Sequence, residues 1–342
     1  MPESLQRRES KMLRRSDEKN SSYQYDRFED LLFMKENGQS TSIKIIGVPV
    51  DLGASRRGTD GGVSAVRIAR LGEKLKKLGY RIADEVDVAV PSRASSSTET
   101  EGNMRFRGEI LQVCRELAVA TRDALQQGHI PMVVGGDHSL AIGSVSGIAD
   151  YYQQQNQQLG LVWFDAHADM NIPGISPSGN IHGMPLSHLL GYGDQDFISI
   201  LSATPKIRPE NVALVGVRDI DEKEKALIKQ SGVKVYSMRD IDELGMSRVA
   251  DEVIDIVTKN TVGFHVSFDV DGCDPDVMPG SGTLVPGGVT YREAHLLLEK
   301  CAETKLMTSM DLVELNPFLD KGNISAERAV SLVLSAFGQS VI

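Results

Sequence analysis

Short apolar runs alternate with amphipathic stretches along most of this chain, and this alternation constrains its fold more than any other feature. Residues 43–50 form a β-branched run, and residues 63–78 carry apolar side chains at helical spacing. Similar patterns recur, predicting strands at 130–134, 159–164, 212–217, 233–236, 262–270 and 306–315, and helices at 108–127 and 291–304. Strands that alternate with helices pair in parallel. We therefore predict an α/β fold, a mainly parallel β-sheet flanked by helices on both faces.

The domain organisation predicted from these patterns is simple. No internal repeat or linker divides residues 43–342, so we expect a single domain there. Residues 1–42 are polar and carry mixed charges, and no apolar stretch typical of a secretory signal follows them. We expect this N-terminal tail to be flexible or to form a short helix that contacts another subunit.

Composition excludes several classes of protein. A net charge of −10 argues against a nucleic-acid partner, and no run of 18 apolar residues is present that would cross a membrane. The three cysteines, Cys114, Cys273 and Cys301, are too few and too scattered for a disulfide framework, which favours reduced thiols. We therefore expect a cytoplasmic protein with neither a nucleic-acid nor a membrane partner.

Three short clusters carry the chemistry of the chain: Gly-Gly-Asp-His-Ser at 135–139, Asp-Ala-His-Ala-Asp at 165–169 and Asp-Val-Asp at 269–271. Side chains at i, i+2 and i+4 of an extended segment point to the same side, so the acidic and histidine residues of each cluster can converge. Each cluster follows an apolar strand. Each cluster is thus expected at the carboxyl ends of the strands, where open parallel sheets bind ligands.

Besides Asp137, the clusters together supply four carboxylates and two imidazoles, which would repel one another strongly unless divalent cations neutralised them. A mixed oxygen and nitrogen set without cysteine suits Mn²⁺, and Co²⁺, Ni²⁺, Fe²⁺ and Zn²⁺ are compatible substitutes. Two such ions lower the pKa of a shared water toward about 7 and generate hydroxide. An isolated Asp or His more often caps a helix or a turn, but three clusters together favour a two-metal hydrolytic site.

The segments 133–139, 164–171, 267–275 and 50–60 resemble the signatures of the ureohydrolase family, which includes arginases and agmatinases. The resemblance extends from about residue 43 to residue 338. It implies an arginase-like three-layer αβα fold, with one catalytic domain over residues 43–342 and a homo-oligomer, either a trimer or a hexamer. It also implies two Mn²⁺ ions per subunit. In the family pattern one ion is held by His138, Asp165, Asp169 and Asp269, and the other by Asp165, His167, Asp269 and Asp271.

The outer residues of the resemblance point to the substrate. The segment 176–183 is similar to the arginase loop, in which the counterparts of Asn171 and Ser178 contact an α-carboxylate and that of Asp221 serves the α-amino group. Neutral donors suit carboxylate oxygens, and an aspartate pairs with an ammonium. Thr283 matches a substrate-loop position shared across the family. The implied substrate is L-arginine, hydrolysed to L-ornithine and urea.

Three residues have implied catalytic roles. Hydroxide bridging the two ions attacks the guanidinium carbon, Asp169 relays a proton as the C–N bond breaks, and His182 shuttles protons to bulk water. Glu314 is expected to bind the substrate guanidinium. Three alternatives stay open: an agmatinase, which would convert agmatine to putrescine and urea; a hydrolase of another guanidino or formimino substrate; and a non-enzymatic binding protein.

Overall fold

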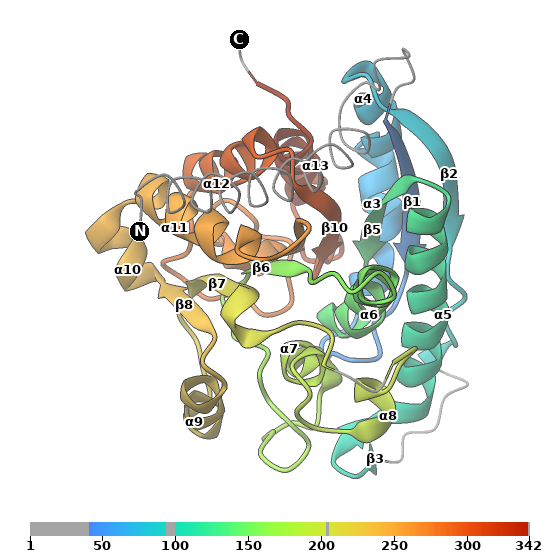
Figure 1. The fold of residues 1–342 in the computed structure, drawn as a ribbon, viewed down its shortest axis with the longest axis vertical. Helices are drawn as coiled ribbons and strands as arrows, with labels where there is room; N and C mark the ends of the chain where they lie inside the picture. The colour runs from blue at the N-terminus through green and yellow to red at the C-terminus, as the bar shows by residue number, and fades with distance from the viewer. Residues whose placement is uncertain (1–40, 94–99, 203–204, 341–342) are drawn as a thin grey trace, which may run out of the picture.

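One parallel sheet forms the centre of the computed structural model, which describes residues 41–93, 100–202 and 205–340. The strand order is β2-β1-β5-β10-β9-β6-β7-β8 (Figure 1). The bounds are β1 Ser42–Val48, β2 Arg81–Asp87, β5 His129–Gly135, β6 Gly160–Phe164, β7 Val212–Val217, β8 Lys234–Ser237, β9 Phe264–Asp269 and β10 Met307–Val313. A separate antiparallel hairpin joins β3 (Thr100–Glu101) to β4 (Met104–Arg105). The predicted mainly parallel α/β fold is confirmed.

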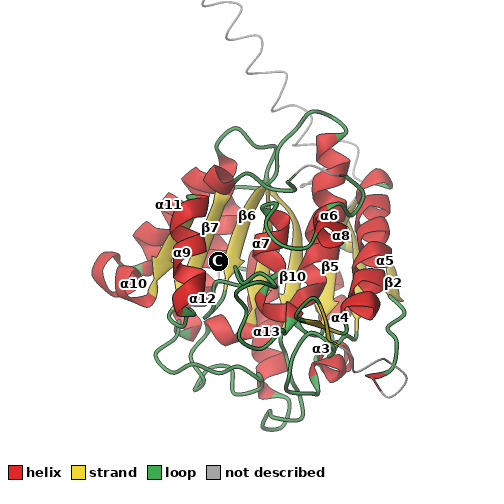
Figure 2. Cartoon of the chain, turned by 90° about the horizontal axis from the view of Figure 1, so that it is seen from below, coloured by secondary structure: helices red, strands yellow, loops and turns green. Residues whose placement is uncertain are grey.

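Helices cover both faces of the sheet (Figures 1 and 2). One layer contains α3 Gly62–Ile68, α4 Leu71–Lys77, α10 Met238–Leu244, α11 Met246–Thr258, α12 Tyr291–Glu303 and α13 Ile324–Ala336. The other contains α5 Arg107–Gln126, α6 Ala141–Gln153, α7 Pro185–Leu189, α8 Gln195–Ile198 and α9 Glu222–Ser231. Short 3₁₀ turns lie in the connections: η1 Thr59–Gly61, η3 His138–Leu140, η4 Ile181–Gly183, η5 Pro209–Asn211 and η6 Val270–Gly272.

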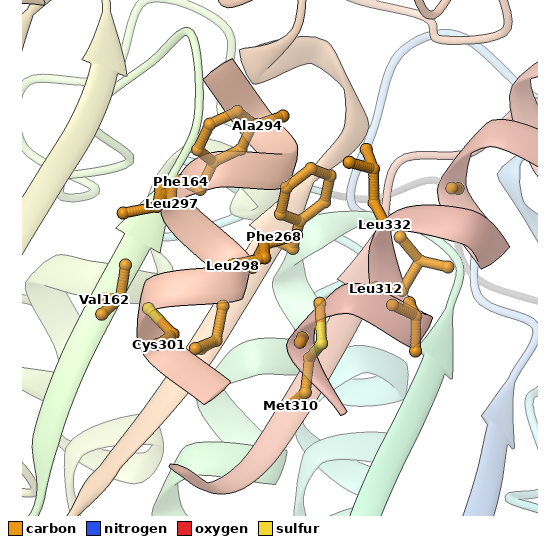
Figure 3. Close-up of a cluster of buried hydrophobic side chains, with 14 of the residues drawn as sticks. Val162, Phe164, Phe268, Ala294, Leu297, Leu298, Cys301, Met310, Leu312 and Leu332 are labelled. Atoms are coloured by element: carbon orange, nitrogen blue, oxygen red, sulfur yellow. The ribbon is translucent and has the colours of Figure 1, made fainter. Parts of the chain in front are cut away.

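Alternation along the strands builds two cores. In β6, Val162 and Phe164 face the α11–α12 layer, whereas Leu161 and Trp163 face the opposite one, because successive side chains of a strand point to opposite faces. Figure 3 shows the first of these cores, where side chains of β6, β9 and β10 pack against α12 and α13. Full burial of each large apolar side chain in such a core contributes about 1.5–3 kcal/mol. Burial on the two faces of the sheet therefore fixes both helix layers on it.

Two local predictions were wrong in detail. The helix predicted over residues 63–78 is divided into α3 and α4 at Arg70, whose φ of 64° is left-handed. Apolar spacing continues on both sides of this break, so the pattern does not reveal it. Strand β2 was missed because its sequence is charged and largely exposed. It is an edge strand that pairs only with β1, so no apolar run is required.

The predicted tail, residues 1–42, lies outside the described residues except for its last two, and the sheet begins at Ser42. Over the described ranges, every helix is too short or too polar to cross a bilayer.

Candidate metal centre and substrate pocket

The glycine pair at 135–136 brings His138 close to the end of the sheet. A Cβ on Gly136 would lie only 2.0 Å from the carbonyl oxygen of Val50, so only glycine fits between the two segments. Asp137 then caps the 3₁₀ turn η3 by accepting from the backbone N–H of Ser139 at 3.1 Å. The chain therefore turns directly from β5 into the site.

Two stacked rings set the position of two carboxylates. Phe164 and Phe268 are partners in the register of the neighbouring strands β6 and β9, and their rings stack with centroids 4.3 Å apart and planes 6° apart. The residue after Phe164 is Asp165, which directly follows β6, and the residue after Phe268 is Asp269, the last of β9. Because adjacent side chains of a strand point to opposite faces, ring stacking on one face sets the two carboxylates side by side on the other.

The first candidate ligand group surrounds His138. Its Nδ1 atom lies 3.2 Å from Asp165 Oδ2, 3.0 Å from Asp169 Oδ2 and 3.2 Å from Asp269 Oδ2. All four side chains are buried. Although burial lowers the pKa of His138, the three nearby carboxylates outweigh it and raise that pKa well above the usual value. This charge pattern attracts a proton or a cation.

The second group surrounds His167, whose Nδ1 atom lies 3.3 Å from Asp165 Oδ1 and 3.3 Å from Asp271 Oδ2. Asp165 thus presents one carboxylate oxygen to each group, and both groups have the dimensions of a metal site. The structure therefore brings together all six residues predicted to be metal ligands, and it places Asp165 where a bridging ligand is expected.

One buried atom tests whether a metal fits this cluster. Nε2 of His138 is 2.9 Å from Ser267 Oγ, whereas Nδ1 has no hydrogen-bond partner among the described residues. If Nε2 carries the proton and donates it to Ser267, the lone pair of Nδ1 points at three carboxylates. A divalent cation between these atoms removes the repulsion, so the donor set fits a metal ion.

Sequence reasoning missed two residues that hold the candidate ligands. Ser267 fixes the His138 ring through the contact just described. Trp163 stacks on that ring, with centroids 4.2 Å apart, and donates from Nε1 to Asp165 Oδ2 at 3.1 Å. Strand periodicity could have found both, because each lies two residues before an aspartate of the site and so shares its face.

A pocket opens next to the candidate ligands, with a volume of about 640 Å³ that includes open solvent at its mouth. Predicted site residues form much of its wall: His167, Asp169, Asn171, Ser178, His182, Asp221, Asp269, Asp271 and Thr283. The wall also contains Ser176, Asn180, Asp219 and Glu224, to which the predicted site assigned no role. The wall therefore contains candidate metal ligands, a group of neutral donors that we call the neutral end, and three further carboxylates, Asp219, Asp221 and Glu224.

The neutral end is a turn of residues 176–180 in which serine hydroxyls serve as acceptors. The backbone N–H of Gly179 donates to Ser176 Oγ at 3.1 Å, and that of Asn180 donates to Ser178 Oγ at 3.2 Å. Each hydroxyl is fixed by an incoming bond and keeps its own proton to donate. This turn is suited to binding a carboxylate.

The start of α9 forms another part of the wall. Asp221 and Glu224 make a capping box, and Asn171 Nδ2 donates to Asp221 Oδ2 at 2.9 Å. Glu224 accepts from the backbone N–H of Met170 at 2.7 Å, and burial raises the pKa of Glu224 to about 7. The Asp-x-x-Glu spacing is a sequence signature of a capping box, so it could have placed Glu224 beside Asp221.

His182 lines the pocket, and Glu314 lies behind it. Nδ1 of His182 is 3.0 Å from Glu314 Oε1, which also accepts from the backbone N–H of His138 at 2.8 Å. Burial disfavours the charged imidazole, but the Glu314 carboxylate outweighs this effect and raises the pKa of His182 to about 9. The pocket wall does not include Glu314, so its predicted contact with the substrate guanidinium stays a prediction.

Asp169 and Glu314 have a left-handed backbone, with φ of 52° and 61°. Residues other than glycine rarely adopt it, and such strain is commonly retained at functional sites. Asp169 is also electrostatically perturbed, because burial and the Asp165 charge raise its pKa to about 6.

Arg218 holds the second ligand group in place. Its position in the sequence suggests an ion pair with Asp219 or Asp221, but its guanidinium instead donates to five backbone carbonyls. These belong to Gly216, Asp271, Gly272, Cys273 and Val285. Thr283, two residues before Val285, donates to Asp271 Oδ2 at 2.7 Å. The loop that carries Asp271 is therefore tied to both β7 and the substrate loop.

Paired ligand groups at the carboxyl ends of a parallel sheet define a binuclear metal-dependent hydrolase. The Arginase family model matches residues 41–338, and the chain belongs to this family. The arginase of Bacillus caldovelox is 45% identical over 300 residues, covering 88% of this chain and 99% of the relative. Its native crystal structure superimposes with a TM-score of 0.84 at 44% identity, over 88% of this chain and 99% of that one. The Entamoeba histolytica arginase, solved in complex with L-ornithine, gives a TM-score of 0.80 at 30% identity, covering 88% and 100%.

Proposed function

We propose that this protein is an arginase, which hydrolyses L-arginine to L-ornithine and urea. The observation that carries the proposal is a single pocket that joins two ligand groups sharing Asp165 to a turn of neutral donors. A guanidinium suits the acidic end, and an α-carboxylate suits the hydroxyls of Ser176 and Ser178. The names of the similar proteins agree with this assignment.

The ions belong to the proposal as well. His138, Asp165, Asp169 and Asp269 would hold one Mn²⁺, and Asp165, His167, Asp269 and Asp271 the other. When bound, the two ions supply an activated water at neutral pH. Oxygen-rich ligands with two imidazoles favour Mn²⁺, and Co²⁺, Ni²⁺, Fe²⁺ or Zn²⁺ are the substitutes to compare with it.

The remaining steps fall to side chains of the pocket. Asp221 accepts from Asn171 and retains acceptor capacity for the substrate ammonium, while Asn171 and Ser178 bind its carboxylate. Asp169, next to His138, carries a proton to the leaving amine, and His182 exchanges protons with solvent from the pocket wall. Glu314 orients His182. The same proposal includes the contact of Glu314 with the substrate guanidinium and the contact of Thr283 with the substrate.

Urea release from L-arginine and from agmatine, each with Mn²⁺-loaded and chelator-treated protein, tests this function. We expect metal-dependent release that favours arginine by orders of magnitude. A preference for agmatine, which has no α-carboxylate, would contradict carboxylate recognition by Asn171 and Ser178. Release of urea from neither substrate would reject the arginase assignment.

We also propose that the protein is a cytoplasmic homo-oligomer, a trimer or a hexamer. Large apolar side chains stay exposed on the single chain, Phe318 at 76% and Ile68 at 72%, and contact with other copies would cover them. The three cysteines are buried and unpaired, as is usual in a reducing compartment. Light scattering during size-exclusion chromatography measures the assembly, and a monomer would contradict it.

A further inference from the structure

The pocket wall presents a charge problem for the proposed substrate. Among the described residues, its lining contains six carboxylates and no lysine or arginine. Three of them, Asp169, Asp269 and Asp271, are candidate metal ligands whose charge the proposed ions would offset. The other three, Asp219, Asp221 and Glu224, suit the ammonium of the substrate but repel its α-carboxylate. Neutral donors on the 176–180 turn can accept the carboxylate but add no net positive charge. A cation close behind the turn would offset the repulsion.

Arg105, at the end of the β3–β4 hairpin, is placed to do this. Its Nη1 atom lies 3.5 Å from Asn180 Oδ1, on the pocket wall, and 3.2 Å from Ser55 Oγ. Asn180 Nδ2 in turn donates to Ser55 Oγ at 2.9 Å, so the three side chains form one cluster. Within the described parts of the chain, these neutral groups are the side-chain partners of Arg105 and no carboxylate pairs with it, so its charge is not neutralised by a direct partner.

The hairpin also holds the turn mechanically. The backbone N–H of Arg105 donates to the carbonyl of Gly179 at 2.9 Å. Asn103, in the hairpin bend, donates from Nδ2 to the carbonyls of Pro173 at 2.7 Å and Ser176 at 3.0 Å. These bonds fix the hairpin backbone at Arg105 relative to the turn, and the guanidinium is held by its contacts with Ser55 and Asn180.

We propose that Arg105 is a specificity-determining residue, which favours substrates with an α-carboxylate over their decarboxylated counterparts. This inference rests on the proposed arginase function. Arg105 acts through the field of its guanidinium and through Asn180, so it is a positioning residue and takes no part in the chemical step. Arg105 is exposed, so an effective dielectric constant of about 60 applies, and opposite unit charges about 7 Å apart then correspond to about a 4-fold change in affinity.

The test compares arginine with agmatine in holoenzyme variants. Arg105→Gln removes the charge, Arg105→Lys keeps it, and Arg239→Gln is the matched control, because it removes an equal charge from the exposed surface of α10. We expect Arg105→Gln to raise KM for arginine about 4-fold, with kcat and the agmatine kinetics unchanged. Arg105→Lys should recover most of the loss, and Arg239→Gln should match the wild type. Added salt should reduce the arginine preference of the wild type more than that of Arg105→Gln.

Two results would overturn the inference while leaving the proposed function intact. Equal losses for arginine and agmatine in Arg105→Gln would show that the hairpin only braces the turn. Unchanged kinetics for both substrates would show that the charge has no effect. By contrast, a wild-type holoenzyme that releases no urea from arginine would reject the proposed function itself, and the inference with it.

Discussion

Replacing Ser267 by alanine should weaken one of the two metal ions selectively. Nε2 of His138 lies 2.9 Å from Ser267 Oγ, and both side chains are buried. With an ion at Nδ1, Nε2 carries the proton and donates it to Ser267. Metal binding at Nδ1 draws electron density from the ring, so the Nε2–H bond strengthens when the ion is present. Loss of such a partner costs about 1.4–2.7 kcal/mol of metal binding, which is about 10- to 100-fold in Kd.

The effect should be confined to the ion held by the His138 group, because the His167 group makes no contact with Ser267 in the hydrogen bonds described above. The assay is metal content after equilibration against a series of free Mn²⁺ concentrations. The wild type should bind two ions per chain throughout the middle of the range, where Ser267→Ala should retain one.

Ser309→Ala is the matched control. Ser309 lies 2.9 Å from Nδ1 of His265, and both are fully buried, but His265 is not a candidate ligand. This variant removes the same kind of bond from the neighbouring strand and should bind both ions normally. Two results would refute the reasoning. In one, Ser267→Ala binds two ions with wild-type affinity; in the other, Ser267→Ala and Ser309→Ala both lose the two ions to the same extent.

Three further predictions follow from the buried polar groups. Arg218→Lys cannot satisfy five carbonyls and should weaken the ion near Asp271 about 10-fold in metal titrations, and weakening of the other ion alone would contradict this. Asp311→Ala removes a buried carboxylate that accepts from Ser144 Oγ and lies 3.2 Å from His265 Nε2, and it should lower the free energy of unfolding by about 1–3 kcal/mol, measured with urea on metal-free protein; a loss below about 0.5 kcal/mol would contradict it. Burial lowers the pKa of His138 and His167, but neighbouring carboxylates outweigh burial and raise it. Metal binding should therefore release protons, and the Kd of the metal should rise as the pH falls. Calorimetry in two buffers of different ionisation enthalpy checks this, and equal heats would be the contrary result.

Periodicity predicted most of the fold because buried elements need apolar faces. Seven of the eight strands in the sheet have such runs, and the exception, β2, lies at an edge where charged residues are tolerated. The break at Arg70 has a different cause. Apolar spacing reports which side chains are buried but not the backbone angle at one residue, so two short helices resemble one long helix.

The candidate ligands were predictable for a similar reason: they occur as short motifs directly after strands. Residues that act on those motifs from elsewhere in the chain were harder to find. Arg105 and Glu224 reach the pocket from a hairpin and from a helix start, through contacts that depend on the packing of distant segments. The capping-box spacing could have placed Glu224 beside Asp221, but spacing within one segment carries no information about contacts between distant segments, such as that of Arg105 with Asn180 or that of Glu224 with Met170.

The place of β10 in the sheet has a consequence for how the protein is made. β10 is the last strand in the chain, yet it lies between β5 and β9 and is the link between the β2-β1-β5 and β9-β6-β7-β8 parts of the sheet. His138 follows a strand of one part, whereas Asp165 follows β6 and Asp269 ends β9 in the other. During synthesis, the two parts therefore have no joining strand until residues 307–313 leave the ribosome, and the metal centre can form only after β10 has been translated.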